Sequence, residues 1–165
     1  MLVRSTGTGF SNRQVQGLGR SRSKRLNQKI TVLGSEYKNS GEIMSAELKQ
    51  KLIALLEEQF IRSDDKVTFD YVMQKKIKSM GYHLQRNFAI SLSGGRRGFI
   101  DCLVTTPDGH RCAIEVDKKS PRKRSVMKLA DLPADISGFV LLRDGKHPLR
   151  YIENGVDVVR ATKFK

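Results

Sequence analysis

The sequence has few cysteines, few histidines and no long apolar run, and each shortage excludes a class of protein. Its 2 cysteines both fall on the predicted core face, which favours buried free thiols in a reducing compartment over a disulfide. The 3 histidines are scattered and form no zinc-ligand set. Apolar runs such as residues 139–142 are too short to span a bilayer, and the N-terminus lacks the apolar segment of a signal peptide. We therefore expect a cytoplasmic protein without a membrane partner.

Acidic residues are scarce relative to basic ones. The chain has 31 lysines and arginines against 17 aspartates and glutamates, which gives a formal net charge of +14. Such an excess favours a polyanionic partner, and nucleic acid is the simplest one. A basic RNA-binding or ribosome-associated protein without catalysis would show the same excess. The charge therefore indicates a partner class but leaves that alternative open.

The first 44 residues differ from the rest of the chain. They are rich in Gly, Ser, Arg, Asn and Gln, with eight lysines and arginines against two acids. Such a segment cannot bury enough apolar surface to fold alone, so residues 1–44 are expected to form a disordered basic arm that grips phosphates. An inert tail is the alternative, and translation could also begin at Met44. Residues 45–165 are expected to form the folded domain.

The hydrophobic spacing of residues 45–165 predicts an α/β fold. Ser45 is expected to cap a first helix that includes Leu48, Leu52, Leu55, Leu56 and Phe60. The other expected elements are a helix over 67–80, a strand over 84–92, a hairpin over 98–118, a short basic helix over 122–132, a strand over 136–142 and a terminal hairpin around 153–155.

The hairpin over 98–118 concentrates acids on one face. Residues 106–110, Thr-Pro-Asp-Gly-His, suit a three-residue turn, and the register that this turn sets places Asp101 opposite Glu115. Facing carboxylates repel each other unless a cation or a proton lies between them. Asp117 shares the face of Glu115. The sequence thus predicts a site for Mg²⁺ or Mn²⁺, the cations that prefer carboxylate oxygens.

The opposite face of this hairpin is apolar, which predicts a half-buried sheet whose other face is wet. On that reading the three acids could simply be solvated. Basic residues lie on both sides of them in the sequence, and they are candidates for contacts with nucleic-acid phosphates. These residues are Arg96, Arg97, Arg122, Lys123, Arg124 and Lys128.

Two short segments, Gly98-Phe99-Ile100-Asp101 and Ile114-Glu115-Val116-Asp117-Lys118, give the region 66–142 a resemblance to the PD-(D/E)XK nuclease superfamily. The resemblance implies an αβββαβ core with a mixed sheet, like that of restriction endonucleases, and a Mg²⁺-dependent endonuclease activity. It also implies that Asp101 and Glu115 are the metal ligands. The superfamily usually has a lysine two residues after the glutamate, and this sequence has Asp117 there.

The missing lysine could be supplied from three places. Strand parity favours Lys119, a bulge or strand end at Asp117 favours Lys118, and Lys128 on the following helix is a third candidate. The candidate catalytic residues are thus Asp101, Glu115, Asp117, Lys118 and Lys119, with Asp101, Glu115 and Asp117 as metal ligands. Asp70, or else Glu57 or Glu58, could assist from a preceding helix.

These observations predict a metal-dependent endonuclease that acts on DNA, including structured or branched DNA of the kind handled in phage and recombination pathways. The alternative is a non-catalytic nucleic-acid-binding protein on a nuclease-like fold. A homodimer is left open.

Overall fold

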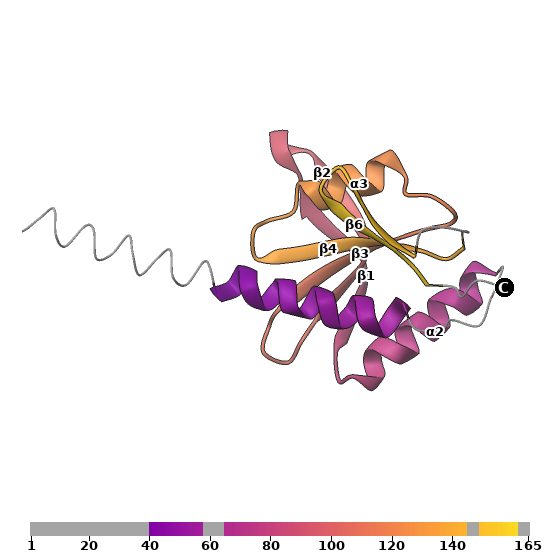
Figure 1. Cartoon of the computed structure of the whole chain (residues 1–165). Coiled ribbons are helices and arrows are strands. Elements are labelled where there is room, and N and C mark those ends of the chain that lie inside the picture. The colour runs from indigo at the N-terminus through magenta and orange to yellow at the C-terminus, as the bar shows by residue number, and fades with distance from the viewer. Residues whose placement is uncertain (1–39, 58–64, 145–148, 162–165) are drawn as a thin grey trace, which may run out of the picture. The chain divides into compact units, whose positions relative to one another are not determined.

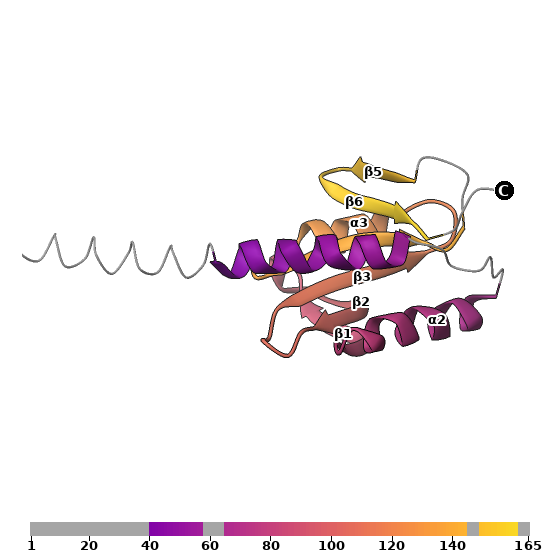
Figure 2. The ribbon, with the colours of Figure 1, turned by 60° about the horizontal axis from the view of Figure 1, so that its bottom comes forward.

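The computed structural model describes residues 40–57, 65–144 and 149–161, which belong to one compact unit. They form an α/β fold with one mixed sheet of six strands, in the spatial order β1-β2-β3-β4-β6-β5 (Figure 1). The strands are β1 His83–Ser91, β2 Arg97–Thr105, β3 Arg111–Asp117, β4 Ile136–Leu142, β5 Arg150–Glu153 and β6 Val156–Arg160. Figure 2 shows β1 and β5 at the two edges of the sheet.

Three α-helices accompany the sheet in the described part of the chain: one over residues 40–57, α2 (Lys66–Ser79) and α3 (Lys123–Ala130). The order α2-β1-β2-β3-α3-β4 confirms the predicted helix-strand-strand-strand-helix-strand core, and the terminal hairpin is also present. No helix within the described residues is long and apolar enough to cross a membrane.

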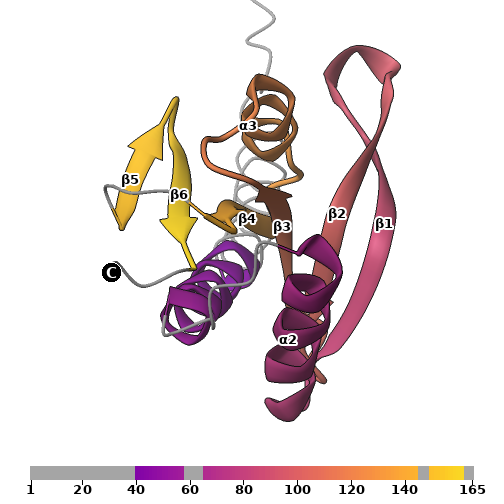
Figure 3. The same cartoon turned by 90° about the vertical axis from the view of Figure 1, so that its right-hand side faces the viewer.

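The sheet is covered on both faces. Helix 40–57 and α2 lie on one face, and α3 lies on the other (Figure 3). The expectation of one wet face is therefore wrong, because Leu103 and Ala113 are buried on the α3 side. Strands β3 and β4 run parallel, and a parallel pair between two helical layers is buried on both faces.

Helix 40–57 corrects the predicted start of the first helix. Ser45 lies inside this helix, where its Oγ donates to the carbonyl of Glu42 at 3.0 Å, so it is not the N-cap. Residues 40–44 of the expected disordered arm are likewise helical. The rest of that arm, together with Glu58 and Phe60, lies outside the described residues.

The two faces of the β1–β2 hairpin exchange sides in its middle. Its regular pairing is interrupted at Asn87, which has a φ of +50°, and the register places Asp101 opposite this residue. On one side of the break Cys102 faces the core beneath α2, whereas on the other side Ile100 and Ile90 face α3. The alternation predicted over residues 84–92 is therefore interrupted, because asparagine tolerates the left-handed conformation and two-stranded ribbons twist strongly.

Both cysteines are buried and free, as the sequence predicted. They lie in the core between the sheet and helices 40–57 and α2. Burial raises the pKa of the Cys102 and Cys112 thiols to about 12. Neither is placed to act as a nucleophile.

Candidate functional site

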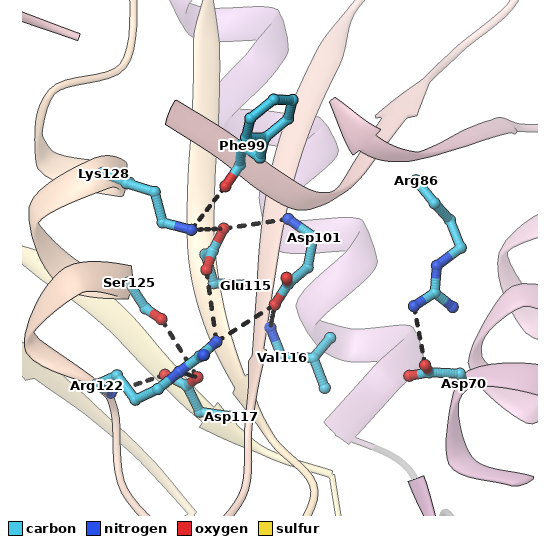
Figure 4. Close-up of polar contacts among 10 residues, drawn as sticks. All are labelled: Asp70, Arg86, Phe99, Asp101, Glu115, Val116, Asp117, Arg122, Ser125 and Lys128. Carbon is cyan, nitrogen blue, oxygen red and sulfur yellow. Dashed lines mark hydrogen bonds and ion pairs between the residues drawn. The ribbon is translucent and has the colours of Figure 1, made fainter. Parts of the chain in front are cut away.

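Strands β2 and β3 separate where the acids lie. The antiparallel pairing runs from Thr105 and Arg111 to Cys102 and Ile114, in the register that the turn predicted. One residue further, side chains replace the backbone ladder (Figure 4). The amide of Asp101 donates to Glu115 Oε1 at 3.1 Å, and the amide of Val116 donates to Asp101 Oδ2 at 2.9 Å. The two facing acids thus hold the strand ends apart instead of projecting freely into solvent.

Glu115 is the most deeply placed acid of the cluster, with a relative exposure of 0%. Its Oε1 accepts hydrogen bonds, but its Oε2 is buried without a hydrogen-bond partner. Burial raises the pKa of Glu115, and the neighbouring carboxylate of Asp101 raises it further, whereas the hydrogen bond from Lys128 opposes the rise. An unsatisfied buried carboxylate oxygen is costly, and such a cost in a folded protein commonly marks a functional group.

Lys128 of α3 brings a positive charge to this acid. Its Nζ lies 2.7 Å from Glu115 Oε1 and 2.7 Å from the carbonyl oxygen of Phe99 (Figure 4). Lys128 was the third lysine candidate and a candidate phosphate contact. The structure places it among the acids, on the edge of the buried face of α3 formed by Ser125, Val126 and Leu129.

Lys118 and Lys119, the lysines favoured by the sequence, lie outside this cluster. Strand β3 ends at Asp117, and the chain bends over residues 118–120, so strand parity does not extend to Lys119. Both lysines are exposed, and no ion pair joins either of them to an acid in the described part of the chain.

Asp117 is buried and bonded to the start of α3. Its Oδ2 accepts the amide of Arg122 at 2.7 Å, and its Oδ1 accepts the Arg122 Nε and the hydroxyl of Ser125, the latter at 3.2 Å. Arg122 is the N-cap of α3 and makes no side-chain capping bond, and the carboxylate of Asp117 on β3 accepts the amide of this N-cap residue near the positive end of the helix. Predicted as a metal ligand, Asp117 has its oxygens engaged in holding α3 against the sheet.

Arg122 points into the acid cluster. Besides its bond to Asp117, its guanidinium lies 3.6 Å from Asp101 Oδ2 and 3.8 Å from Glu115 Oε2 (Figure 4). Burial opposes the charged form, but the contacts with the acids prevail and raise the pKa of Arg122. The side chain is 62% exposed, so it closes the cluster from the solvent side.

Two of these acids, Asp101 and Glu115, have oxygen atoms of the kind that bind divalent cations. The Oε2 of Glu115, which has no hydrogen-bond partner, and the half-exposed carboxylate of Asp101 are hard oxygen donors that face the same guanidinium. Within residues 40–57, 65–144 and 149–161, no three acid, histidine or cysteine side chains are arranged to hold a metal ion. Of the three predicted ligands, Asp117 has both carboxylate oxygens engaged by Arg122 and Ser125.

The other predicted phosphate contacts lie on the exposed surface near α3. Lys123 and Arg124 are exposed on the first turn of α3, and Arg96 and Arg97 are exposed at the tip of the β1–β2 hairpin. This tip ends at the same side of the sheet as α3 (Figure 3). The amide of Ser93 at the tip donates to Asp131, the residue that ends α3.

The proposed assisting acids lie apart from the cluster. Asp70 of α2 accepts Arg86 Nη2 at 2.9 Å, and its other oxygen is buried without a hydrogen-bond partner. Glu57 pairs with Arg150 at 2.6 Å. The structure brings neither acid into contact with Glu115.

Sequence reasoning missed two features of the site: the contact of Lys128 with the carbonyl of Phe99, and the anchoring role of Asp117. The helical spacing of Ser125, Val126 and Leu129 was the available signal for Lys128, because it places residue 128 beside the buried face of α3. Neither a comparison with family models nor a comparison with curated proteins finds a match for this chain.

Proposed function

We propose that this protein is a metal-dependent nuclease that hydrolyses phosphodiester bonds in DNA. The observation that supports it most is the state of Glu115. This acid is fully buried, one oxygen contacts Lys128, and the other has no hydrogen-bond partner and faces the carboxylate of Asp101 across the guanidinium of Arg122. A charged group kept in that state costs stability, and metal-assisted hydrolysis is a chemistry that uses it.

Asp101 and Glu115 would hold Mg²⁺ or Mn²⁺, which when bound lowers the pKa of a water and neutralises charge on a phosphate. Glu115 would contribute its Oε2, which has no hydrogen-bond partner, and Asp101 would contribute the carboxylate that accepts the amide of Val116. The ammonium of Lys128 has three donors, and Glu115 and the carbonyl of Phe99 occupy two of them. The third can orient a water or stabilise charge that develops on the phosphate.

The expected substrate follows from the charge of the chain and its distribution. The formal net charge is +14, and Arg96, Arg97, Lys123 and Arg124 are exposed on the side of the sheet that carries α3. A phosphate backbone that contacts these residues would pass near Asp101. Binding of this kind depends strongly on salt, because it releases counterions from the nucleic acid.

The second candidate function is non-catalytic binding of nucleic acid, and the position of Arg122 favours it. Its guanidinium already neutralises the acids that a metal would need, and Asp117 stands where the resemblance implies a lysine. On this account the acids serve only to hold α3 and Arg122 in place.

A cleavage experiment separates the two functions. Duplex, single-stranded and four-way-junction DNA are incubated with the protein in Mg²⁺, Mn²⁺ or EDTA. The nuclease account predicts cleavage that EDTA abolishes, that Asp101→Asn abolishes, and that Asp108→Asn leaves unchanged. Asp108 is the matched control because it lies exposed in the turn at the far end of the same hairpin. Binding without cleavage in either metal would replace the nuclease account with the binding account.

A further inference from the structure

We infer that Phe99 is a stacking platform for an unpaired base next to the cleaved phosphate, so that the preferred substrate is DNA with unpaired nucleotides. This inference rests on the proposed function for its ligand class, nucleic acid. It adds which structural form of nucleic acid the site selects and which residue selects it.

Phe99 presents its ring to solvent from the strand that also carries Asp101. The residue is 60% exposed, whereas the next residue, Ile100, is fully buried on the α3 side. In Figure 4 the ring projects from β2 away from the acid cluster, while the carbonyl of Phe99 points to Lys128. A solvent-exposed ring at this place costs hydrophobic free energy that a stacked base would recover.

Single exposed apolar residues are ordinary, so the residues around Phe99 must indicate which kind of ligand its ring would contact. Arg97 lies two residues earlier on β2, Arg96 precedes it at the hairpin tip, and Lys128 is bonded to the carbonyl of Phe99. An exposed ring bordered by cations suits a nucleotide strand, because the cations contact phosphates while the ring contacts a base. The same surroundings disfavour an apolar protein partner, which would have to bury those charges.

The backbone that carries the ring is held by hydrogen bonds and packing. The Nζ of Lys128 holds the backbone of Phe99 at 2.7 Å, and the amide of Ser93 ties the hairpin tip to Asp131. Leu92 lies over Gly98, where an added Cβ would be only 3.0 Å from Leu92 Cδ1. Because two residues of a strand span about 6.6–6.8 Å, Phe99 lies roughly that far from Asp101 along β2. The backbone that carries the ring is thus fixed at a distance from Asp101 that suits contact with the nucleotide next to the one being cut.

The preference for unpaired nucleotides follows from access. In a continuous duplex both faces of every base are covered by its neighbours, so an aromatic side chain finds no free face. Single strands, flaps, gaps and junction branch points offer such a face, and stacking on it tolerates any base. Phe99 therefore favours these forms over intact duplex without reading their sequence.

A fluorescence experiment tests the contact directly, because the chain has no tryptophan. Phe99→Trp creates a single reporter, and Tyr71→Trp is its control, since Tyr71 is 66% exposed on α2, a different element from β2. Both are titrated in EDTA, which prevents cleavage, with oligothymidine and with a duplex of equal length. We expect the Phe99→Trp signal to be quenched by the single strand, and the Tyr71→Trp signal to stay unchanged.

Affinity measurements by fluorescence anisotropy of labelled DNA complete the test. Phe99→Ala should weaken single-strand binding by about 5- to 100-fold, Phe99→Tyr should retain it, and duplex binding should change little. Equal single-strand affinity for wild type and Phe99→Ala, or absence of quenching where anisotropy shows binding, would overturn the inference alone. A wild-type protein that binds no nucleic acid would instead overturn the proposed function.

Discussion

Lys128 Nζ lies 2.7 Å from Glu115 Oε1, although the two residues are 13 positions apart in the sequence. The contact exists because α3 crosses β3 at this point, and Asp117 fixes the start of α3 there. Asp117, two positions after Glu115, therefore supplies no positive charge itself. It holds α3, and Lys128 of α3 brings the positive charge to Glu115.

We expect Asp117 to stabilise the fold by holding the start of α3 against the sheet. Asp117→Ala removes the acceptor for the Arg122 amide and for the buried Ser125 hydroxyl. We predict that the free energy of unfolding falls by about 1–3 kcal/mol in urea denaturation, since a helix cap and a buried hydrogen bond are lost.

Asp101→Asn is the matched comparison for Asp117→Ala. Its amide oxygen can still accept the hydrogen bond from Val116, so we expect near-wild-type stability but a loss of Mn²⁺ binding in calorimetry. The reverse pattern, in which Asp117→Ala abolishes Mn²⁺ binding and leaves stability unchanged, would return Asp117 to the ligand set.

Arg122 is expected to compete with the metal ion, because its guanidinium lies within 3.8 Å of both proposed ligands. Removing a unit charge at such a distance near solvent is worth about 1 kcal/mol, so Arg122→Gln should bind Mn²⁺ about 5-fold more tightly by calorimetry. Arg124→Gln is the control, since Arg124 is also basic and exposed at the start of α3. Equal Mn²⁺ affinity for wild type and Arg122→Gln would show that the guanidinium does not occupy the metal position.

Glu115 is expected to make stability fall as pH rises. Burial raises its pKa above the ordinary value of 4.5, so the folded protein keeps a proton that the unfolded chain has already lost. The free energy of unfolding is then lost as pH rises from 4.5 toward the folded pKa. Glu115→Gln lacks this loss, and its melting temperature should exceed that of wild type by more at about pH 7 than at about pH 5.

Glu47→Gln controls for the removal of one negative charge from a cationic protein, because Glu47 is exposed on helix 40–57. The prediction concerns the difference between the two variants. A melting temperature for Glu115→Gln that drops relative to wild type as pH rises would contradict the raised pKa.

The two cysteines are expected to be inert in the folded protein. Burial raises the pKa of Cys102 and Cys112 to about 12, and neither thiol is exposed. A disulfide thiol reagent at about pH 8 should therefore react slowly with native protein and rapidly with both thiols in denaturant. Rapid labelling of the native protein would show that this core opens readily.

The order of the elements could be predicted because it depends on local patterns. Helical and strand periodicity set the element types, and the turn at residues 106–110 set the register that brings Asp101 opposite Glu115. The exchange of the two faces of the β1–β2 hairpin at Asn87 could not be predicted. It depends on a left-handed conformation there that asparagine tolerates but does not require.

Lys128 was one of three lysine candidates, but its contact with Glu115 could not be predicted over one from Lys118 or Lys119, because the contact depends on how closely α3 approaches the sheet. An added Cβ at Gly138 of β4 would lie 2.7 Å from Leu129 Cδ2, so this glycine permits the close packing of α3. Asp117 then fixes the start of the helix. Both constraints are contacts between a helix and the sheet, and the spacing and parity of residues within one element do not determine them.

The most direct test of this account asks which lysine supplies the positive charge next to Glu115. Single-turnover cleavage of end-labelled DNA in Mn²⁺ is measured for wild type, Lys128→Met, Lys118→Met and Lys119→Met, each shown to be folded by circular dichroism. Lys128→Arg is included because it keeps a positive charge near the buried Glu115. We predict that Lys128→Met cuts about 10²- to 10⁴-fold more slowly while Lys118→Met and Lys119→Met cut like wild type. Wild-type cleavage by a folded Lys128→Met, or its loss in Lys119→Met, would contradict the account.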